Sequence, residues 1–359
     1  MSFGENYAEP AGIAGSEGSY IAIYTNGQGK TARIAPLDAG GNSMPPGEQA
    51  LASATADTFG GPIVRLGDGY ATAWQDRRFG NYEVFFSVLG SSGNKVLPEV
   101  RLSEAPGFSI APSLCRRGEE LTVIWQDDEA SGKYEVHGQR VDANGGLLGG
   151  VTKLTTSAGV GVAAPSVACG PGGVGVAWRE GDPQTGDLRF QTFDPSLAPV
   201  TAQPITLTGG NSDPRGAAVV WAGDRYVVAW SDESASPHAI HAAAVAEDGT
   251  VLVPATVITQ PGAGRSRFPA LRVAGERVIV AYQDNRDDNQ GYEIYVRIVA
   301  KDLTPVGDEV RITTAPNDST TPHLARGPAG DLGVLFSDYE PADLTVQVYF
   351  ARVTCETPP

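Results

Sequence analysis

The sequence predicts an all-β fold, a seven-bladed β-propeller of four-stranded antiparallel blades. An apolar run, a large aromatic, one intervening residue and an acid recur together at intervals of 50 to 54 residues, a spacing typical of propeller blades or solenoid repeats. The 359 residues include 45 Gly and 26 Pro, which disfavours long helices. The repeated aromatic stands at Tyr24, Trp74, Trp125, Trp178, Trp230, Tyr282 and Phe336.

Each repeat opens with a short strand that we expect to begin at a proline, because the missing amide donor suits a strand start. These prolines are Pro62, Pro112, Pro165, Pro269 and Pro322. A glycine-rich turn leads to the second strand, which carries the repeated phrase, as in 121–125 and 278–282. Since both faces of this strand are apolar, it must lie between two other sheets, as in blades stacked around an axis.

The third and fourth strands complete the repeat. The third follows a polar loop, as at 82–85, 134–137 and 292–295, and the fourth is short and charged, as at 100–102 and 310–312, which suits an outer edge. The last repeat lacks a fourth strand. We expect residues 1 to about 6 to supply it and close the ring, making 1–359 one domain. The alternative is a strand supplied by residues beyond Pro359.

Charge and hydropathy restrict the partners and the location. The chain has 26 basic and 42 acidic residues, a net charge of −16, which repels phosphate backbones, so we expect no nucleic-acid partner. No run of 18 apolar residues occurs, so we expect no membrane insertion. The first residues do not read as a signal peptide. The protein is either cytosolic or, as we favour, secreted or surface-displayed with its export signal removed.

Three cysteines, Cys115, Cys169 and Cys355, allow at most one internal disulfide. Cys115 and Cys169 follow Pro112 and Pro165 by three and four residues, so they would lie on neighbouring inner strands. A bridge between them is one alternative. We favour three unbridged thiols, because a free cysteine packs well as a small apolar side chain.

Two copies of the repeat carry a longer motif. Residues 74–85 read W-Q-D-R-R-F-G-N-Y-E-V-F, and 282–286 with 291–295 read Y-Q-D-N-R and G-Y-E-I-Y. This pattern resembles the W-Q-D-x-R-x-G-x-x-[DE]-I-Y blades of TolB-like and related secreted or cell-surface bacterial propeller proteins. The resemblance covers nearly the whole chain, with looser copies elsewhere. It implies the fold but not the function, because such repeats occur in proteins of many roles.

The acid two places after the aromatic is the first candidate for binding. It recurs as Asp76, Asp127, Glu180, Asp232, Asp284 and Asp338. Because these positions are equivalent, we expect a ring of carboxylates at the mouth of one face. One hypothesis is that the ring collects cations or hydrogen-bonds sugar hydroxyls. We favour the other, that each carboxylate accepts amides of its own loop or pairs with Arg78 or Arg286, because repetition in every blade suits a structural demand.

The loops on the same face vary most between copies, as binding loops on a rigid scaffold do. They carry Phe59, Phe108, Arg215, Arg265, Arg267 and Phe268. Arg265, Arg267 and Phe268 are the most distinctive, since two guanidiniums beside an aromatic would hold a carboxylate or a sugar face. An ordinary solvated loop is the alternative. The predicted ligand-binding residues are these three together with Asp76, Asp127, Asp232, Asp284 and Asp338.

Two further segments resemble known binding motifs but depart from them at defining positions. Residues 284–291, D-N-R-D-D-N-Q-G, have the oxygen density of a calcium loop, but Arg286 occupies a ligand position and the glycine comes late. We therefore expect no cofactor, with a calcium ion as the alternative. Residues 170–175, G-P-G-G-V-G, satisfy G-x-G-x-x-G, yet no helix is expected to follow, so we predict a hairpin.

Catalytic signatures are missing from the sequence: G-x-S-x-G, H-E-x-x-H and C-x-x-C do not occur. Sialidase-like boxes place an aspartate before the tryptophan, whereas here it follows. We predict a non-catalytic extracellular binding module that recognises carbohydrate or, as the next ligand class, protein. The alternative is a glycan-cleaving propeller enzyme with a carboxylate pair. A third hypothesis is a structural spacer in a longer surface protein.

Overall fold

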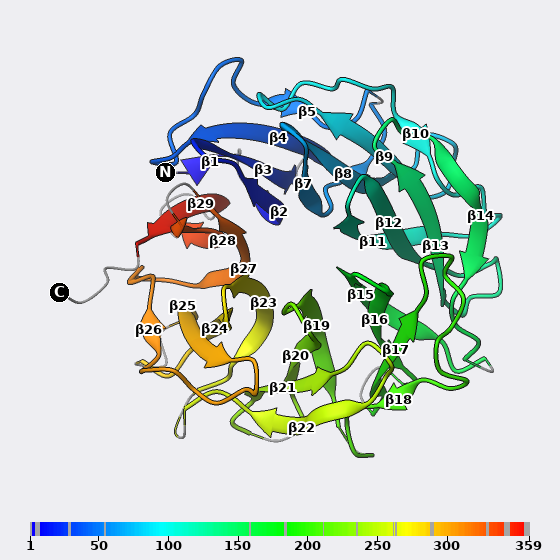
Figure 1. The fold of residues 1–359 in the computed structure, drawn as a ribbon. Helices are drawn as coiled ribbons and strands as arrows, with labels where there is room; N and C mark the ends of the chain where they lie inside the picture. The colour runs from blue at the N-terminus through cyan, green and yellow to red at the C-terminus, as the bar shows by residue number, and fades with distance from the viewer. Residues whose placement is uncertain are drawn as a thin grey trace.

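The chain forms a seven-bladed β-propeller, as the sequence predicted, with no α-helix among the described residues (Figure 1). The computed structural model describes residues 2–3, 8–27, 30–53, 55–157, 159–182, 185–210, 212–234, 236–260, 262, 264–287, 291–327, 330–340 and 345–354. Within each blade the strands pair antiparallel, from a first strand beside the axis to a fourth at the rim (Figure 1).

Blades 1 to 3 take up the first part of the chain. Blade 1 contains β2 (Ala8–Gly15), β3 (Ser19–Asn26), β4 (Thr31–Asp38) and β5 (Gln49–Ala50). Blade 2 contains β6 (Thr58–Phe59) and β7 (Ile63–Leu66), which together form its first strand, then β8 (Gly69–Asp76), β9 (Glu83–Leu89) and β10 (Val100–Arg101). Blade 3 contains β11 (Ser109–Arg117), β12 (Glu120–Asp127), β13 (Glu135–Asp142) and β14 (Leu147–Lys153).

Blades 4 to 7 complete the circle. Blade 4 contains β15 (Val162–Gly170), β16 (Gly173–Glu180), β17 (Asp187–Phe193) and β18 (Ile205–Thr206). Blade 5 contains β19 (Pro214–Trp221), β20 (Tyr226–Asp232), β21 (Ala239–Val245) and β22 (Val251–Val257). Blade 6 contains β23 (Arg267–Ala274), β24 (Arg277–Asp284), β25 (Glu293–Ala300) and β26 (Val310–Arg311). Blade 7 contains β27 (Ser319–Arg326), β28 (Leu332–Glu340), β29 (Thr345–Val353) and β1 (Ser2–Phe3).

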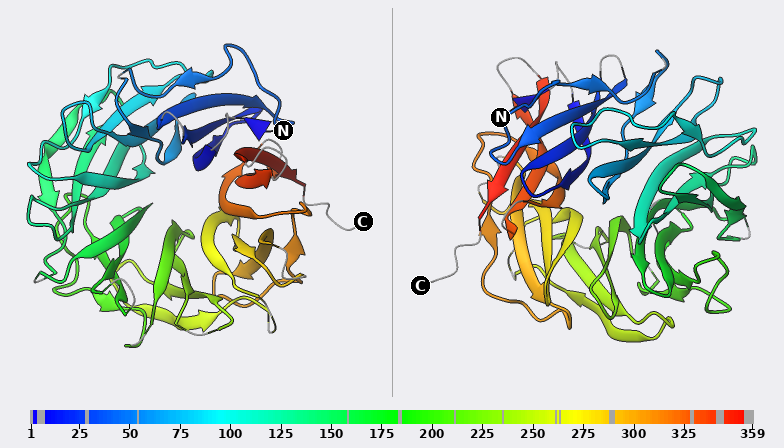
Figure 2. Two further views of the ribbon diagram at one scale, coloured as in Figure 1. Left: turned by 180° about the vertical axis from the view of Figure 1, so that it is seen from behind. Right: turned by 45° about the horizontal axis from the view of Figure 1, so that its top comes forward.

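The ring closes through the N-terminus, as predicted. Strand β1 pairs antiparallel with β29 and supplies the fourth strand of blade 7 (Figures 1 and 2). Blade 7 also packs on blade 1, where the ring centroids of Tyr20 and Phe350 lie 4.9 Å apart. Closure covers the strand edge that an open ring would expose.

The core is divided among the junctions between blades. Seven apolar clusters each join side chains of two neighbouring blades, and Trp74, Trp125, Trp178 and Trp230 are at most 1 % exposed. The two apolar faces of each second strand are therefore covered by the blades on either side. The predicted hairpin at 170–175 is confirmed as the turn between β15 and β16.

Four of the five prolines lie inside the first strands, so the prediction that these strands begin at proline was wrong for Pro112, Pro165, Pro269 and Pro322. Pro62 lies between β6 and β7, directly before β7. Strand β11 begins at Ser109, before Pro112, and its ladder slips between Ile110 and Ser113. Ala111, just before the proline, has a φ of 53°. A bulge admits proline within a strand because the ladder is locally interrupted there. It also turns the amide of the bulged residue out of its own sheet.

Cys115 of β11 and Cys169 of β15 form a disulfide with Cα atoms 5.4 Å apart. The favoured hypothesis of unbridged thiols was therefore wrong for this pair. The bond crosses between the first strands of blades 3 and 4, where the two cysteines approach each other. Cys355 lies outside the described residues.

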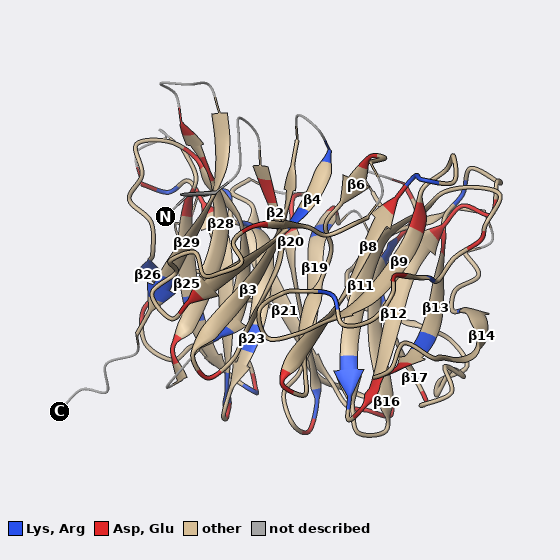
Figure 3. Cartoon of the chain, turned by 90° about the horizontal axis from the view of Figure 1, so that it is seen from above, with Lys and Arg blue, Asp and Glu red and all other residues tan. Residues whose placement is uncertain are grey.

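The propeller has two distinct faces. The second strands end on one face, named the acid face here, which also holds the loops leading into the first strands. The opposite face, the hairpin face, holds the turns between first and second strands. In Figure 3 the acid face is at the top, where β6 lies, and the hairpin face is at the bottom, toward which β11 points. Within the described residues no helix is long and apolar enough to cross a membrane.

Candidate functional site

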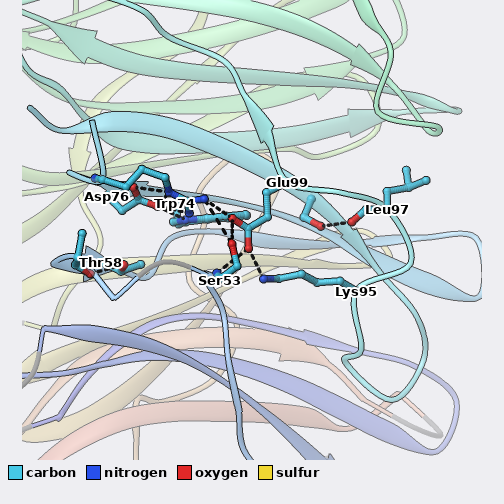
Figure 4. Close-up of polar contacts among 10 residues, drawn as sticks. Ser53, Thr58, Trp74, Asp76, Lys95, Leu97 and Glu99 are labelled. Atoms are coloured by element: carbon cyan, nitrogen blue, oxygen red, sulfur yellow. Dashed lines mark hydrogen bonds and ion pairs between the residues drawn. The ribbon is translucent and has the colours of Figure 1, made fainter. Parts of the chain in front are cut away.

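Blade 2 shows how the repeated motif holds its acid (Figure 4). The Asp76 carboxylate is 0 % exposed and accepts hydrogen bonds from Trp74 Nε1 and the backbone amide of Arg78, both at 3.1 Å. The Arg78 guanidinium forms ion pairs with Asp76 and with Glu99. Glu99 also accepts the backbone amide of Ser53 at 2.7 Å. The motif thereby ties blade 2 to the loop that leaves blade 1.

Blade 6 repeats this network. Asp284 is 0 % exposed and accepts the backbone amide of Arg286 at 2.8 Å and the hydroxyl of Ser266. The Arg286 guanidinium pairs with Asp284 and Glu309. Burial opposes its charge, but the bonds to the two acids prevail and raise the pKa of Arg286. The arginine of the motif is therefore committed to acids of its own blade.

Blades 3 and 5 lack the arginine and satisfy their acids with hydroxyls and amides. Asp127 accepts Ser109 Oγ at 2.7 Å and the amide of Glu129 at 2.9 Å. Asp232 accepts the amide of Ser234 at 3.0 Å and its hydroxyl at 2.6 Å. Burial raises the pKa of Asp232, yet the bonds from Ser234 outweigh it and hold the pKa below its usual value.

Blade 7 is the exception. Its acid, Asp338, is 9 % exposed, and Glu340 stands where blade 2 has Arg78. Burial and the charges of Glu340 and Glu293 raise the pKa of Asp338 to about 6. Its Oδ1 atom is buried without a hydrogen-bond partner among the described residues. This carboxylate therefore ionises less readily than a normal aspartate does.

The predicted acids thus share one end of the second strands but differ in their surroundings. Asp76, Asp127, Asp284 and Asp338 are 0 to 9 % exposed, and Asp232 is half-buried. The first three are held by bonds within the protein, in the way the favoured structural hypothesis requires. Contact between these carboxylates and a ligand stays a prediction.

The glutamine between aromatic and acid has a role that the sequence analysis missed. It reaches into the next blade and accepts the amide of the bulged residue before the proline. These bonds run from Ala111, Ala164 and Thr321 to Gln75, Gln126 and Gln283, at 2.6, 2.9 and 3.0 Å. Repetition of the glutamine in the sequence was the available signal, but nothing local to one blade shows that a backbone amide of the next blade will donate to it.

The three distinctive loop residues lie on the acid face at blade 6. Arg267 donates Nε to Glu233 of the preceding blade at 2.7 Å. Phe268 is 39 % exposed, with the Arg267 guanidinium 5.9 Å from its ring centroid. Arg265 is exposed, and its backbone amide donates to Asn285. Arg267 is therefore engaged within the protein, while Arg265 and Phe268 face solvent.

A row of aromatic rings lies on the acid face at blades 2 and 3. The Phe59 and Tyr82 centroids are 5.7 Å apart in an edge-on arrangement, and those of Tyr82 and Phe108 are 6.0 Å apart and tilted. Phe108 is 46 % exposed, and the other two rings are partly exposed. Phe59 and Phe108 were expected among the variable loop residues of this face. Tyr82, which joins them, was identified only as part of a third strand.

A channel of about 610 Å³ follows the propeller axis between the first strands of all seven blades. Its wall consists mainly of the prolines and of small or apolar residues near the bulges. Among the described residues that line it, Glu9 is the one acid and Arg272 the one arginine. Burial lowers the pKa of His323, in the same wall, to about 4, so this imidazole is neutral at pH 7. A pair of facing carboxylates does not occur in this described lining.

The candidate calcium loop is described only in part, since 288–290 lie outside the described residues. Asp284 at its start is bonded to Arg286 and Ser266. Within the described ranges no group of three or more metal-ligating side chains could hold an ion. Calcium binding here stays an untested alternative.

Comparisons with known proteins show the fold. No protein-family model matches the chain, and no curated protein matches its sequence. The TolB-like resemblance therefore remains a resemblance. A puromycin-hydrolysing peptidase of Mycobacterium tuberculosis aligns with a TM-score of 0.60 and 13 % identity, over 96 % of this chain and 50 % of that one.

Two other structures align comparably. A structure from a study of two prolyl endopeptidases has a TM-score of 0.55 and 12 % identity, covering 96 % of this chain and 47 % of that one. A protein of unknown function from Dyadobacter fermentans has a TM-score of 0.55 and 13 % identity, covering 81 % and 93 %. This chain spans about half the length of the two peptidases. At such identities the likeness concerns the propeller alone.

Proposed function

We propose that the protein is a non-catalytic binding module that recognises carbohydrate on its acid face. The observation that carries the proposal is the row of Phe59, Tyr82 and Phe108. The C–H face of a sugar ring is apolar and weakly positive, so it stacks on the negative face of an aromatic ring. Sites of this kind combine apolar rings with a few polar groups.

Polar groups adjoin this row. Asp57, two residues before Phe59, pairs with Arg77 at 3.0 Å and with Lys30 at 3.5 Å. The Arg77 side chain is 53 % exposed. These groups offer hydrogen bonds to sugar hydroxyls beside the aromatic surface. A protein ligand, the second class, would use the same exposed rings as anchors.

The test is binding of the intact protein to a glycan array, followed by calorimetry with the best glycan. Replacing Phe108 with Ala should weaken binding about tenfold or more, since a lost stacking contact is worth about 1–2 kcal/mol. Phe79→Ala is the matched control, because Phe79, on the adjoining blade 2, is 59 % exposed but stacks on Phe85 instead. Equal loss in both variants, or binding to proteins and no glycan, would refute the carbohydrate proposal.

A glycan-cleaving enzyme is the second candidate, and one observation favours it. Asp338, with its pKa raised to about 6, has the property that a general acid requires. Product release from a polysaccharide panel, abolished by Asp338→Asn in a folded protein, would establish this activity and overturn the non-catalytic proposal. The similarity to the two peptidases does not bear on this enzyme hypothesis, because the alignments cover only about half of each peptidase chain.

We also propose that the protein works in an oxidising compartment, secreted or at the cell surface. The Cys115–Cys169 disulfide supports this, since such bonds form and persist outside the reducing cytosol. Alkylation of the protein isolated from its natural host, with and without reductant, tests the proposal. Complete alkylation without reductant would contradict it.

A further inference from the structure

The junction between blades 6 and 7 places two arginines in the position of the disulfide. In blade 3, Cys115 of the first strand pairs with the residue of the second strand that lies three positions before the repeated aromatic. In blade 4, Cys169 pairs with the residue that lies four positions before it. Arg272 and Arg326 pair at the same two positions in blades 6 and 7. Because the blades repeat one geometry, these arginines face each other across their junction as the cysteines do across theirs.

Other junctions fill this pair of positions without opposing like charges. Ala168 and Trp221 meet between blades 4 and 5 in one apolar cluster, and Val220 and Val273 meet between blades 5 and 6 in another. Two cations at such a position repel each other, because each lies where its neighbour's field is strong. Burial and Arg326 together lower the pKa of Arg272.

The two guanidiniums lack partners within the described part of the chain. Neither Arg272 nor Arg326 forms an ion pair or side-chain hydrogen bond there, whereas Arg116, at the position equivalent to Arg326 in blade 3, donates to the carbonyl oxygens of Gly118 and Arg65. The nearby acid Asp331 is 8 % exposed and pairs with Arg352. In a protein of net charge −16, an unmatched arginine pair is a local exception.

The pair is accessible from the hairpin face. Both arginines keep surface that is open to solvent, although the channel wall surrounds Arg272 closely enough to lower its pKa. They line a cavity of about 770 Å³ at that end of the channel, with Ser16, Glu17 and Arg65. Arg272 also lines the axial channel itself. An ion entering from the hairpin face would therefore meet both guanidiniums at the mouth of the channel.

We propose that Arg272 and Arg326 form a binding site for an inorganic tetrahedral oxyanion, phosphate or sulfate. Guanidinium groups bind such anions through paired N–H donors, and two of them facing one cavity share the charge of one ion. Bound anion would replace the repulsion across the junction by two attractions. The site lies on the face opposite the aromatic row, so it stands or falls independently of carbohydrate recognition.

Calorimetric titration of the intact protein with sodium phosphate, at ionic strength held constant with sodium chloride, tests the site, and sodium sulfate is the second probe. Wild type should bind, and Arg272→Gln and Arg326→Gln should each lose about tenfold or more in affinity. Arg311→Gln, which removes an exposed arginine from the outer strand of blade 6, should bind phosphate as wild type does. Absence of binding by wild type, or equal losses in all three variants, would overturn the proposal.

Thermal unfolding provides a second measurement. Phosphate should raise the unfolding midpoint of wild type but not that of Arg272→Gln, since only a protein with the site gains from the ligand. Without phosphate, Arg272→Gln should unfold at the same temperature as wild type or higher, because the repulsion is gone. A lower midpoint in that variant would show that Arg272 has a structural partner, which contradicts the proposal.

Discussion

The junction between blades 3 and 4 and the junction between blades 6 and 7 have the same backbone geometry but opposite chemistry. In the first, Cys115 and Cys169 are covalently joined on the hairpin side, and Glu180 of blade 4, the acid equivalent to Asp338, pairs with Arg189 on the acid side. In the second, two arginines face each other on the hairpin side, and Asp338 of blade 7 lies near other acids. One junction is closed by bonds within the protein, while the other retains like charges at both ends.

This difference separates residues that hold the ring together from residues that are available to other molecules. Groups that repel one another in a folded protein persist where a function retains them or where the rest of the fold tolerates the cost. Both junctions have the hydrogen bond from a bulge amide to the glutamine of the preceding blade, at Gln126 and at Gln283. The backbones of the two junctions are therefore held in the same way. The contrast therefore lies in the side chains that face each other, and four measurements can test it.

The largest effect is expected from opening the disulfide. A bond between residues 54 apart restricts the unfolded chain, and the chain-entropy model predicts a loss of about 4 kcal/mol in the free energy of unfolding for Cys115→Ser with Cys169→Ser. Denaturant unfolding of the oxidised wild type and the double variant measures it. If the variant is as stable as wild type, the closed junction is no stronger than the charged one.

The next largest effect is expected at Asp127. Asp127→Ala leaves the buried Ser109 hydroxyl and the Glu129 amide without their acceptor, which should cost about 3 kcal/mol in the free energy of unfolding. Asp338→Ala is the matched variant at the equivalent position of blade 7 and should cost less. Equal losses in the two variants, measured by urea unfolding, would remove the contrast between these acids.

A smaller effect, equal at the two junctions, is expected from removing the glutamine that accepts the bulge amide. Gln126→Ala and Gln283→Ala each leave one bulge amide without its acceptor, so each should lower the free energy of unfolding by about 1–2 kcal/mol. The same denaturant measurement applies. A clear difference between the two variants would show that the junctions already differ in their scaffold.

The smallest effect is a change in pH dependence at Asp338. Its pKa in the folded protein is raised to about 6 from 3.8, so its contribution to stability is full below about pH 4 and is lost as the pH rises through about 6. Asp338→Asn should remove this decline and unfold at a higher temperature than wild type at pH 7.

Asp232→Asn is the control with the opposite sign. Its pKa is lowered, so Asp232 stabilises the protein above its unfolded pKa, and the variant should lose stability at pH 7. Thermal midpoints between pH 4 and 7 check both variants. A wild-type midpoint that follows that of Asp338→Asn across this range would contradict the raised pKa.

The sequence predicted the elements whose pattern repeats within a single blade. Trp125 and its equivalents mark second strands, because an aromatic at the end of a two-sided apolar run requires cover from two neighbours. Ring closure by the N-terminal residues also followed from counting strands in the last repeat. The starts of the first strands were misplaced, because a proline is compatible with a bulge as well as with a strand start.

The candidate sites were predicted less completely. Phe59 and Phe108 were named, but Tyr82 joins them only because the loop of blade 2 lies against the loop that enters blade 3. Arg267 was predicted to contact a ligand, and its guanidinium is paired with Glu233, 34 residues earlier in the chain. Contacts of this kind depend on distant segments, which a local pattern does not specify.

By itself the sequence determined the blade repeat, the burial of its aromatics and the closure of the ring, because hydrophobic periodicity is a property of each blade. Only the tertiary structure decided that Cys115 meets Cys169 and that Arg272 meets Arg326. Those meetings depend on the register between two first strands, which is set by a bulge in each and by the angle at which whole blades pack. Neither quantity is encoded in a residue's immediate neighbours.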